Sequence, residues 1–308
     1  MWGATSRPTH GLPQACDAHK AIALRKLLII GQLATSTTLI TMKPIHRDNV
    51  EMLNQEIDDE KGSYRIRAGN RVHYVTIPTS VFDEDTMCRP YLLIPQLPEF
   101  PDYDWTSMNI KRSKENGDLQ TTISSEPLAE VQETWHPLRI DVLSLARKTV
   151  FNSGVHEVVH EGKPAIAKIA CFAWHIPRIE RETWAHRILV ENRLPDEGPF
   201  APRFLAHLTE NGRVIGFLTE KAEGSPAGID DLASCQELVR RLHDLGLVHG
   251  DVNRYNFVVD RRPEGLTLLV DFEHAEGYEE ETGRKELESL ESELAEETGR
   301  GKPVIMKY

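Results

Sequence analysis

Four polar residues near the C-terminal end have types and a spacing that could do chemistry. His249 and Asp251 flank a glycine, and Asn256 follows five residues after Asp251. Asp271 comes after an apolar segment. Phosphoryl transfer needs one carboxylate beside the acceptor hydroxyl and separate oxygen ligands for the metal ions on the phosphates, and this set offers both. Each residue alone also has a structural explanation, as a turn residue, a local cap or a strand-end turn.

A helix and two short strands must position these residues. The apolar spacing predicts the helix over 231–245, with Asp230 or Asp231 as its N-cap and Gly246 as its end. Two apolar segments separated by a turn sequence follow the motif and predict a strand pair. The helix leads the chain into the H-G-D segment, and the second strand ends at Asp271.

The order of these residues resembles the catalytic core of the protein kinase-like superfamily. The coupled pattern of H-x-D-x-x-x-x-N, a short hairpin and a strand ending in D-F-x is far more specific than a single motif. The resemblance implies that Asp251 orients the acceptor hydroxyl, that Asn256 ligates one Mg²⁺ ion and that Asp271 bridges both metal ions. It implies only a bracing role for His249.

The same resemblance implies a lysine on the third strand of an N-terminal lobe and a glutamate on the next helix. Residues 165–169 are similar to the family's V-A-I-K strand, so Lys168 would hold the α- and β-phosphates of ATP. The helix is predicted over 179–192, with Glu182 as the partner of Lys168 and Glu180 as the alternative. Either glutamate could instead belong to a solvated helix face.

Two further segments correspond to nucleotide contacts in the family. Strands are predicted over 143–151, 155–160 and 214–219. The turn between the first two contains one glycine, Gly154, in place of three, so we expect a weaker grip on phosphate. The segment after the third strand resembles the family's hinge, which implies backbone contacts to adenine from Glu220 and Ala222.

The resemblance covers about residues 140–298 and implies an α+β, bilobal protein kinase-like fold with a minimal C-terminal lobe. The domain is expected over 136–308, with lobes at about 136–222 and 223–308. Its H-G-D and D-F-E motifs are similar to those of choline and aminoglycoside kinases. Its short C-terminal lobe is similar to that of RIO-like kinases, and the arrangement resembles short, atypical kinase-like proteins of fungi.

The first 135 residues carry no catalytic constellation. Residues 1–42 are basic, rich in hydroxyl side chains and poor in acids, which is typical of a disordered or targeting-like leader. Residues 43–135 are expected to be a separate small region of unknown function. Apolar spacing predicts a helix over 45–60 there.

Further patterns in the same region predict a hairpin and a loop. The alternation of residue types predicts strands over 64–67 and 71–77, joined by a Gly69-Asn70 turn. A proline-rich stretch follows, in which a regular element could hardly run long. The polar residues from 104 to 126 predict a mobile loop.

At the other end, apolar spacing predicts a closing helix over 285–297 that is capped by Gly299. The many acidic residues of this tail are expected to form its solvated face. The alternative is a patch that recruits a cationic substrate.

Composition limits the partners and the compartment. The 36 Lys and Arg against 48 Asp and Glu give a net charge of −12, which argues against general affinity for nucleic acid or an anionic membrane surface. The four cysteines are widely spaced and form no C-x-x-C pair, which favours a reducing compartment and argues against a structural metal. We therefore expect a cytoplasmic protein, or a mitochondrial one if the leader is a transit peptide.

Two functional hypotheses follow. The first is a phosphotransferase that uses ATP and Mg²⁺ to phosphorylate a hydroxyl group of a protein or a small molecule. The second is a pseudokinase, a nucleotide-binding scaffold without turnover. Five residues together favour the first: Lys168, Glu182, Asp251, Asn256 and Asp271. The single glycine and the short C-terminal lobe favour the second.

Overall fold

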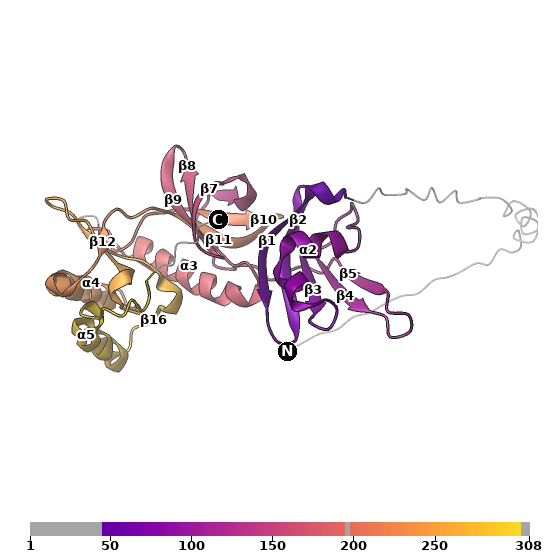
Figure 1. The fold of residues 1–308 in the computed structure, drawn as a ribbon. Coiled ribbons are helices and arrows are strands. Elements are labelled where there is room, and N and C mark those ends of the chain that lie inside the picture. The colour runs from indigo at the N-terminus through magenta and orange to yellow at the C-terminus, as the bar shows by residue number, and fades with distance from the viewer. Residues whose placement is uncertain (1–44, 195–197, 303–308) are drawn as a thin grey trace, which may run out of the picture. The chain divides into compact units, whose positions relative to one another are not determined.

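The computed structural model describes residues 45–194 and 198–302 (Figure 1). Over these ranges the fold is mixed α+β, with four β-sheets and five α-helices. The described residues belong to one compact unit. The leader predicted over 1–42 lies outside them. In the same ranges no helix has both the length and the apolar character needed to cross a bilayer.

The first sheet has five strands in the order β1-β2-β3-β4-β5. The strands are β1 (Val50–Ile57), β2 (Lys61–Ala68), β3 (Arg71–Pro78), β4 (Ser107–Arg112) and β5 (Leu119–Ser124). Neighbours are antiparallel except β3 and β4. The predicted hairpin is confirmed as β2 and β3. Gly69 takes a φ of +63° in its turn, a conformation that glycine adopts without steric cost.

The helix predicted over 45–60 is wrong, because that segment forms a 3₁₀ turn, Arg47–Asn49, and then β1. A β-bulge between Met52 and Asn54 explains the error. The extra residue moves the core-facing side chains from even to odd positions, so that Val50 and Met52 reach the same core as Ile57. The interrupted alternation has the spacing of a helix.

The loop predicted over 104–126 is also wrong, because β4 and β5 form an antiparallel hairpin there. Met108 and Ile110 are buried on one face, while the other face is polar and solvated. Trp105 is buried just before β4, and its ring stacks on His73 with 3.8 Å between centroids. The proline-rich stretch holds only short helices, as predicted: α1 (Glu84–Cys88), α2 (Pro90–Leu93) and the 3₁₀ turn Ile94–Gln96.

The second sheet has six strands in the order β6-β10-β11-β9-β8-β7. The strands are β6 (Arg139–Asp141), β7 (Ala146–Asn152), β8 (Val155–His160), β9 (Lys163–Ile169), β10 (Phe204–Glu210) and β11 (Arg213–Glu220). Helix α3 (Ile176–Glu191) packs against this sheet, close to its predicted bounds. The chain before β6 already contacts both elements, since Val131 N–H donates to the Val214 carbonyl and the Trp135 ring N–H donates to the Thr183 carbonyl.

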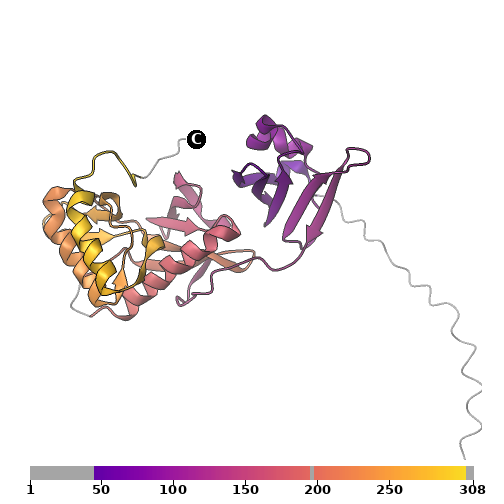
Figure 2. The same ribbon diagram turned by 90° about the horizontal axis from the view of Figure 1, so that it is seen from below.

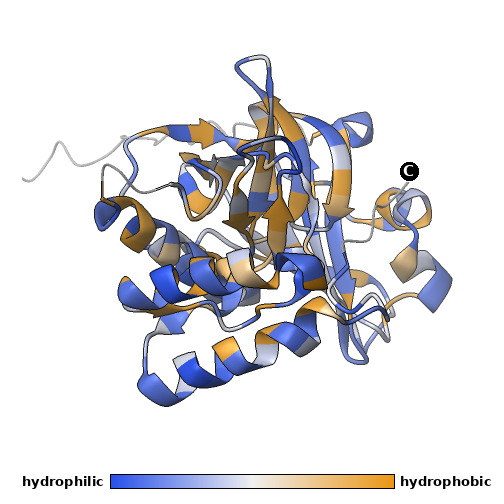
Figure 3. Ribbon diagram, turned by 90° about the vertical axis from the view of Figure 1, so that its left-hand side faces the viewer, coloured by the Kyte–Doolittle hydropathy of each residue, from blue (hydrophilic) through white to orange (hydrophobic). Residues whose placement is uncertain are grey.

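The last part of the chain is built on helices α4 (Leu232–Asp244) and α5 (Glu280–Leu294), which lie side by side (Figure 2). The short strand β12 (Ser225–Pro226) precedes α4. Four more lie between the two helices: β13 (Leu247–Val248), β14 (Phe257–Val259), β15 (Thr267–Leu269) and β16 (Glu276–Gly277). The predicted α4 is confirmed, with its apolar stripe buried and Gly246 following at a φ of +81°. Apolar and polar residues alternate along the helices (Figure 3).

The closing helix differs from its prediction at both ends, because α5 begins at Glu280 and its C-cap is Ala295 rather than Gly299. Glu280 and Glu281 lie in its first turn, where negative charge stabilises the helix dipole. Gly283 has no side chain to collide with the Tyr278 ring.

Candidate active site

Lys168 joins residues from three elements that are far apart in the sequence. Its Nζ on β9 donates to Glu182 Oε2 on α3 at 2.6 Å and to Asp271 Oδ1 just beyond β15. Of the two glutamates predicted as partners, Glu182 therefore makes the contact. The carboxylate of Glu180 instead accepts the backbone N–H groups of Gln132 and Glu133.

One ammonium and two carboxylates leave this partly buried cluster with an excess of negative charge. Burial lowers the pKa of Lys168, but Glu182 and Asp271 reverse this, and the net pKa is raised. Burial raises the pKa of Asp271, but Lys168 more than offsets it, and the net pKa is lowered. Burial, reinforced by the charge of Asp271, raises the pKa of Glu182 to about 7. The cluster therefore favours a further cation.

The backbone at Asp271 is held in an uncommon conformation. Its φ of +70° is left-handed, which costs a residue other than glycine roughly 1–2 kcal/mol. Phe272 is fully buried, and its N–H donates to Glu182 Oε1 at 3.3 Å. The surrounding contacts thus keep Asp271 pointing at Lys168, and such maintained strain is typical of functional positions.

The loop after Asp251 holds that carboxylate from one side. Asn253 Nδ2 donates to Asp251 Oδ2 at 2.9 Å, and Asn256 Nδ2 donates to the same oxygen at 3.1 Å and to the Asp251 carbonyl at 2.8 Å. In the described part of the chain no hydrogen bond reaches Asp251 Oδ1 or Asn256 Oδ1. Both oxygens are therefore available to a ligand.

Asn253 is a site residue that the sequence reasoning missed. Besides holding Asp251, its Oδ1 accepts the Tyr255 N–H and caps the 3₁₀ turn Arg254–Asn256. The available signal was its place two residues after an aspartate, where an asparagine side chain commonly bonds to its local backbone.

Strand pairing brings Asn256 next to Asp271. Strands β14 and β15 are antiparallel, with Phe257 opposite Leu269, and the Val270 N–H donates to the Asn256 carbonyl at 2.9 Å. An amide oxygen and a carboxylate oxygen are hard donors that suit Mg²⁺, which keeps phosphate oxygens and waters as its other ligands. Among the described residues, no three of His, Cys, Asp and Glu gather at a common metal position.

His249 makes the contacts expected of a brace. Its ring is fully buried, and Nε2 lies 3.0 Å from the Val270 carbonyl, to which it donates. Nδ1 then accepts the Asp251 N–H at 3.3 Å. Burial lowers the pKa of His249, which favours the neutral ring that this pattern requires.

Glu286 on α5 holds the backbone of the segment from His249 to Asp251. Its carboxylate accepts the backbone N–H groups of His249 at 3.3 Å and Gly250 at 2.7 Å, and it lies 2.8 Å from His243 Nε2. The prediction that the acidic tail is a solvated face is wrong for this residue, which is 8% exposed. Its spacing of four and eight residues from the buried Leu290 and Leu294 was the missed signal.

The turn at residues 152–154, here called the glycine turn, differs from a phosphate-binding loop. The Gly154 N–H donates to Asn152 Oδ1 at 2.8 Å, so it is already occupied. A Cβ on Gly154 would lie 2.6 Å from the Ile169 carbonyl oxygen. Close approach of β9 therefore explains the glycine, and a phosphate would have to displace Asn152.

The predicted hinge residues lie apart from this cluster. The Glu220 N–H donates to the Arg203 carbonyl, and its carboxylate accepts from the Arg203 guanidinium at 2.6 Å. Glu220 and Ala222 line a cavity of about 670 Å³ whose described lining contains neither Lys168 nor Asp271. The contact to adenine predicted for them stays a prediction.

No model of a known protein family matches this chain, and no curated protein matches its sequence.

Proposed function

We propose that this chain transfers the γ-phosphoryl group of ATP, with Mg²⁺, to a hydroxyl group of a protein or a small molecule. The observation that carries the proposal is the contact of Lys168 with both Glu182 and Asp271, residues 14 and 103 positions away in the sequence. The proposal includes a bilobal kinase-like arrangement of the part from 136 to 308.

In this proposal Lys168 binds the α- and β-phosphates, and Glu182 keeps its ammonium in place. Asp271 and Asn256 would hold Mg²⁺ through the carboxylate and through Oδ1. When bound, the metal neutralises the charge that develops on the phosphate oxygens. The excess negative charge around Lys168 supports this assignment, since a divalent cation would offset it.

In this proposal Asp251 orients the acceptor hydroxyl. Asn253 and Asn256 occupy its Oδ2 and fix the carboxylate plane, so Oδ1 can accept the proton of an incoming hydroxyl. His249 and Glu286 hold the backbone on either side of Gly250. The proposed acceptor contact is thus built on a loop with few free backbone groups.

A second candidate function is a nucleotide-binding scaffold without turnover. The occupied N–H of Gly154 favours it, because a loop that does not grip the phosphates positions them less well for transfer. Both candidates share the lysine and the metal ligands, so only turnover separates them.

The location that we propose is the cytoplasm, with the mitochondrion as the alternative. Within the described ranges Cys88, Cys171 and Cys235 are free thiols, which fits a reducing compartment. The net charge of −12 gives no reason to propose a nucleic-acid partner.

Calorimetric titration with ATP, in Mg²⁺ and in chelator, tests the proposal. We expect binding that depends on Mg²⁺ in the wild type and loses this dependence in Asp271→Ala. Equal affinity with and without metal would contradict the metal assignment. Intact-mass measurement after incubation with Mg²⁺ and ATP, together with phosphate release, then separates an active enzyme from the scaffold, including one that phosphorylates itself or hydrolyses ATP.

A further inference from the structure

Strand β1 of the first sheet contacts two segments that border the proposed active site. Asn54 Nδ2 donates to the Ser153 carbonyl in the glycine turn at 2.9 Å. Glu56 accepts the ring N–H of Trp174 at 2.9 Å, and its other oxygen lies 3.2 Å from His175 Nε2. Trp174 and His175 directly precede α3, the helix that carries Glu182.

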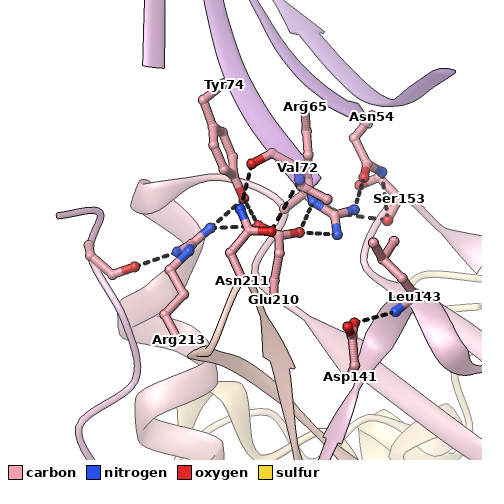
Figure 4. Close-up of polar contacts among 12 residues, drawn as sticks. Asn54, Arg65, Val72, Tyr74, Asp141, Leu143, Ser153, Glu210, Asn211 and Arg213 are labelled. Carbon is pink, nitrogen blue, oxygen red and sulfur yellow. Dashed lines mark hydrogen bonds and ion pairs between the residues drawn. The ribbon is translucent and has the colours of Figure 1, made fainter. Parts of the chain in front are cut away.

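Asn54 is itself held in place by Arg65 on the neighbouring strand. Its Oδ1 accepts from Arg65 at 2.8 Å, and the fully buried Arg65 donates from Nε to Glu210 Oε2 at 2.6 Å (Figure 4). The bulge after Met52 turns Asn54 onto the face that carries Arg65. The amide is therefore oriented before it meets the glycine turn.

Specific polar contacts attach the first sheet at the tip of the β10–β11 hairpin. Glu210 Oε1 accepts from the Tyr74 hydroxyl at 2.6 Å and from Arg213 at 2.9 Å. The Asn211 side chain bonds both the N–H and the carbonyl of Val72 (Figure 4). Buried charged and bidentate contacts of this kind fix one orientation, because a shift would leave charges unpaired.

We propose that the first sheet is a built-in positioning module for the second, and that Asn54 and Glu56 are its positioning residues. Asn54 fixes the glycine turn through the Ser153 carbonyl, which also accepts from Cys171 Sγ at 3.0 Å. Glu56 fixes the start of α3 and thereby the place of Glu182 against Lys168. The effect on catalysis rests on the proposed function, whereas the effect on the turn and helix does not.

Hydrogen exchange of the full-length protein, read by mass spectrometry, tests the structural part. Asn54→Asp keeps an acceptor for Arg65 but removes the donor to Ser153. We expect exchange at residues 151–156 to accelerate about fivefold, the effect of losing one ordinary hydrogen bond. Glu56→Ala should have the same effect at residues 174–180.

Gln55→Ala is the matched control, because the Gln55 amide donates to the Cys88 carbonyl within the region of the first sheet. It should leave exchange at 151–156 unchanged. Unchanged exchange in Asn54→Asp, or equal acceleration in Gln55→Ala, would overturn the proposal. Asn54→Ala offers a second variant if the new carboxylate prevents folding.

Steady-state kinetics tests the catalytic part. For Asn54→Asp we expect the KM for ATP to rise about fivefold while kcat changes little, since one hydrogen bond to the glycine turn is lost. A wild type that binds no ATP would refute the proposed function, and the exchange result would still decide the positioning role. Accelerated exchange with unchanged KM would refute the coupling between the module and the site.

Discussion

The first and second sheets bury different kinds of side chain. The first sheet packs an apolar core, and its main buried charge, Arg65, faces the second sheet. The second sheet and the helices after it bury Glu182, Glu210 and Glu286, together with several histidines, and leave Lys168 only 14% exposed. Burying ionisable groups costs stability, so a region that concentrates them is a candidate for a functional site. The first sheet shows that a buried charge can also be structural, since its Arg65 attaches it to Glu210 of the second sheet.

The largest expected effect comes from breaking the attachment between the two sheets. Arg65→Met leaves Glu210 without its fully buried partner and should lower the free energy of unfolding by about 3–5 kcal/mol. Urea denaturation measures this. Arg203→Met is the control, since it breaks an exposed pair with Glu220 and should cost at most about 1 kcal/mol. Equal losses would show that the attachment is no different from surface pairing.

The next effect sharpens the assignment of chemistry to the second region. Lys168→Met and Asp251→Asn should each reduce phosphotransfer by about 10² or more, because one loses phosphate positioning and the other the acceptor-orienting carboxylate. Activity is compared with that of Arg284→Met, which breaks only an exposed pair with Glu288 on α5. Wild-type turnover in both site variants, with unchanged melting temperature, would refute the kinase mechanism.

The third prediction uses the buried histidines of the second region. Burial lowers the pKa of His186 to about 3 and that of His156 and of His207 to about 4. Below pH 6.5 these histidines bind protons in the unfolded chain but not in the folded one. The stability that the neutral buried histidines allow is therefore complete above pH 6.5 and is lost as pH falls toward 4. The raised pKa of Glu182 acts oppositely, since its contribution is lost as pH rises from 4.5 through about 7.

Replacing one histidine measures this effect. His186→Leu should reduce the loss of unfolding free energy between pH 6.5 and 4 by about 3 kcal/mol. The measurement is urea denaturation at a series of pH values. A pH profile identical to that of the wild type would mean that His186 titrates normally in the folded protein.

The smallest expected effect concerns the support of the Asp251 loop. Glu286→Gln replaces one of the two acceptor oxygens with an N–H₂ group, which cannot accept, so the N–H of His249 or of Gly250 loses its partner. The substitution should cost about 1–3 kcal/mol of unfolding free energy. Glu288→Gln, which loses only an exposed pair with Arg284, should leave stability nearly unchanged. If the two variants have the same melting temperature, Glu286 does not carry the loop.

Local patterns in the sequence determined the elements around the site. In the second sheet, the strands β7, β8, β9 and β11 were predicted, whereas β6 and β10 were not. The helices α3 and α4 and the hairpin of β2 and β3 follow from periodicity and turn residues, which act within a few positions. The coupled motif also singled out Lys168, Glu182, Asp251, Asn256 and Asp271 as candidates. The structure brings Lys168, Glu182 and Asp271 into contact and links Asp251 to Asn256.

Only the tertiary structure decided the rest. The bulge in β1 gives a strand the apolar spacing of a helix, and the polar, solvated face of β4 and β5 gives a hairpin the composition of a loop. Arg65 and Glu210 are 145 positions apart, and Glu286 finds its partners 36 and 37 positions away. Nothing local specifies such partners, because a charged residue that is solvated and one that is buried against a distant donor look alike until the chain has folded.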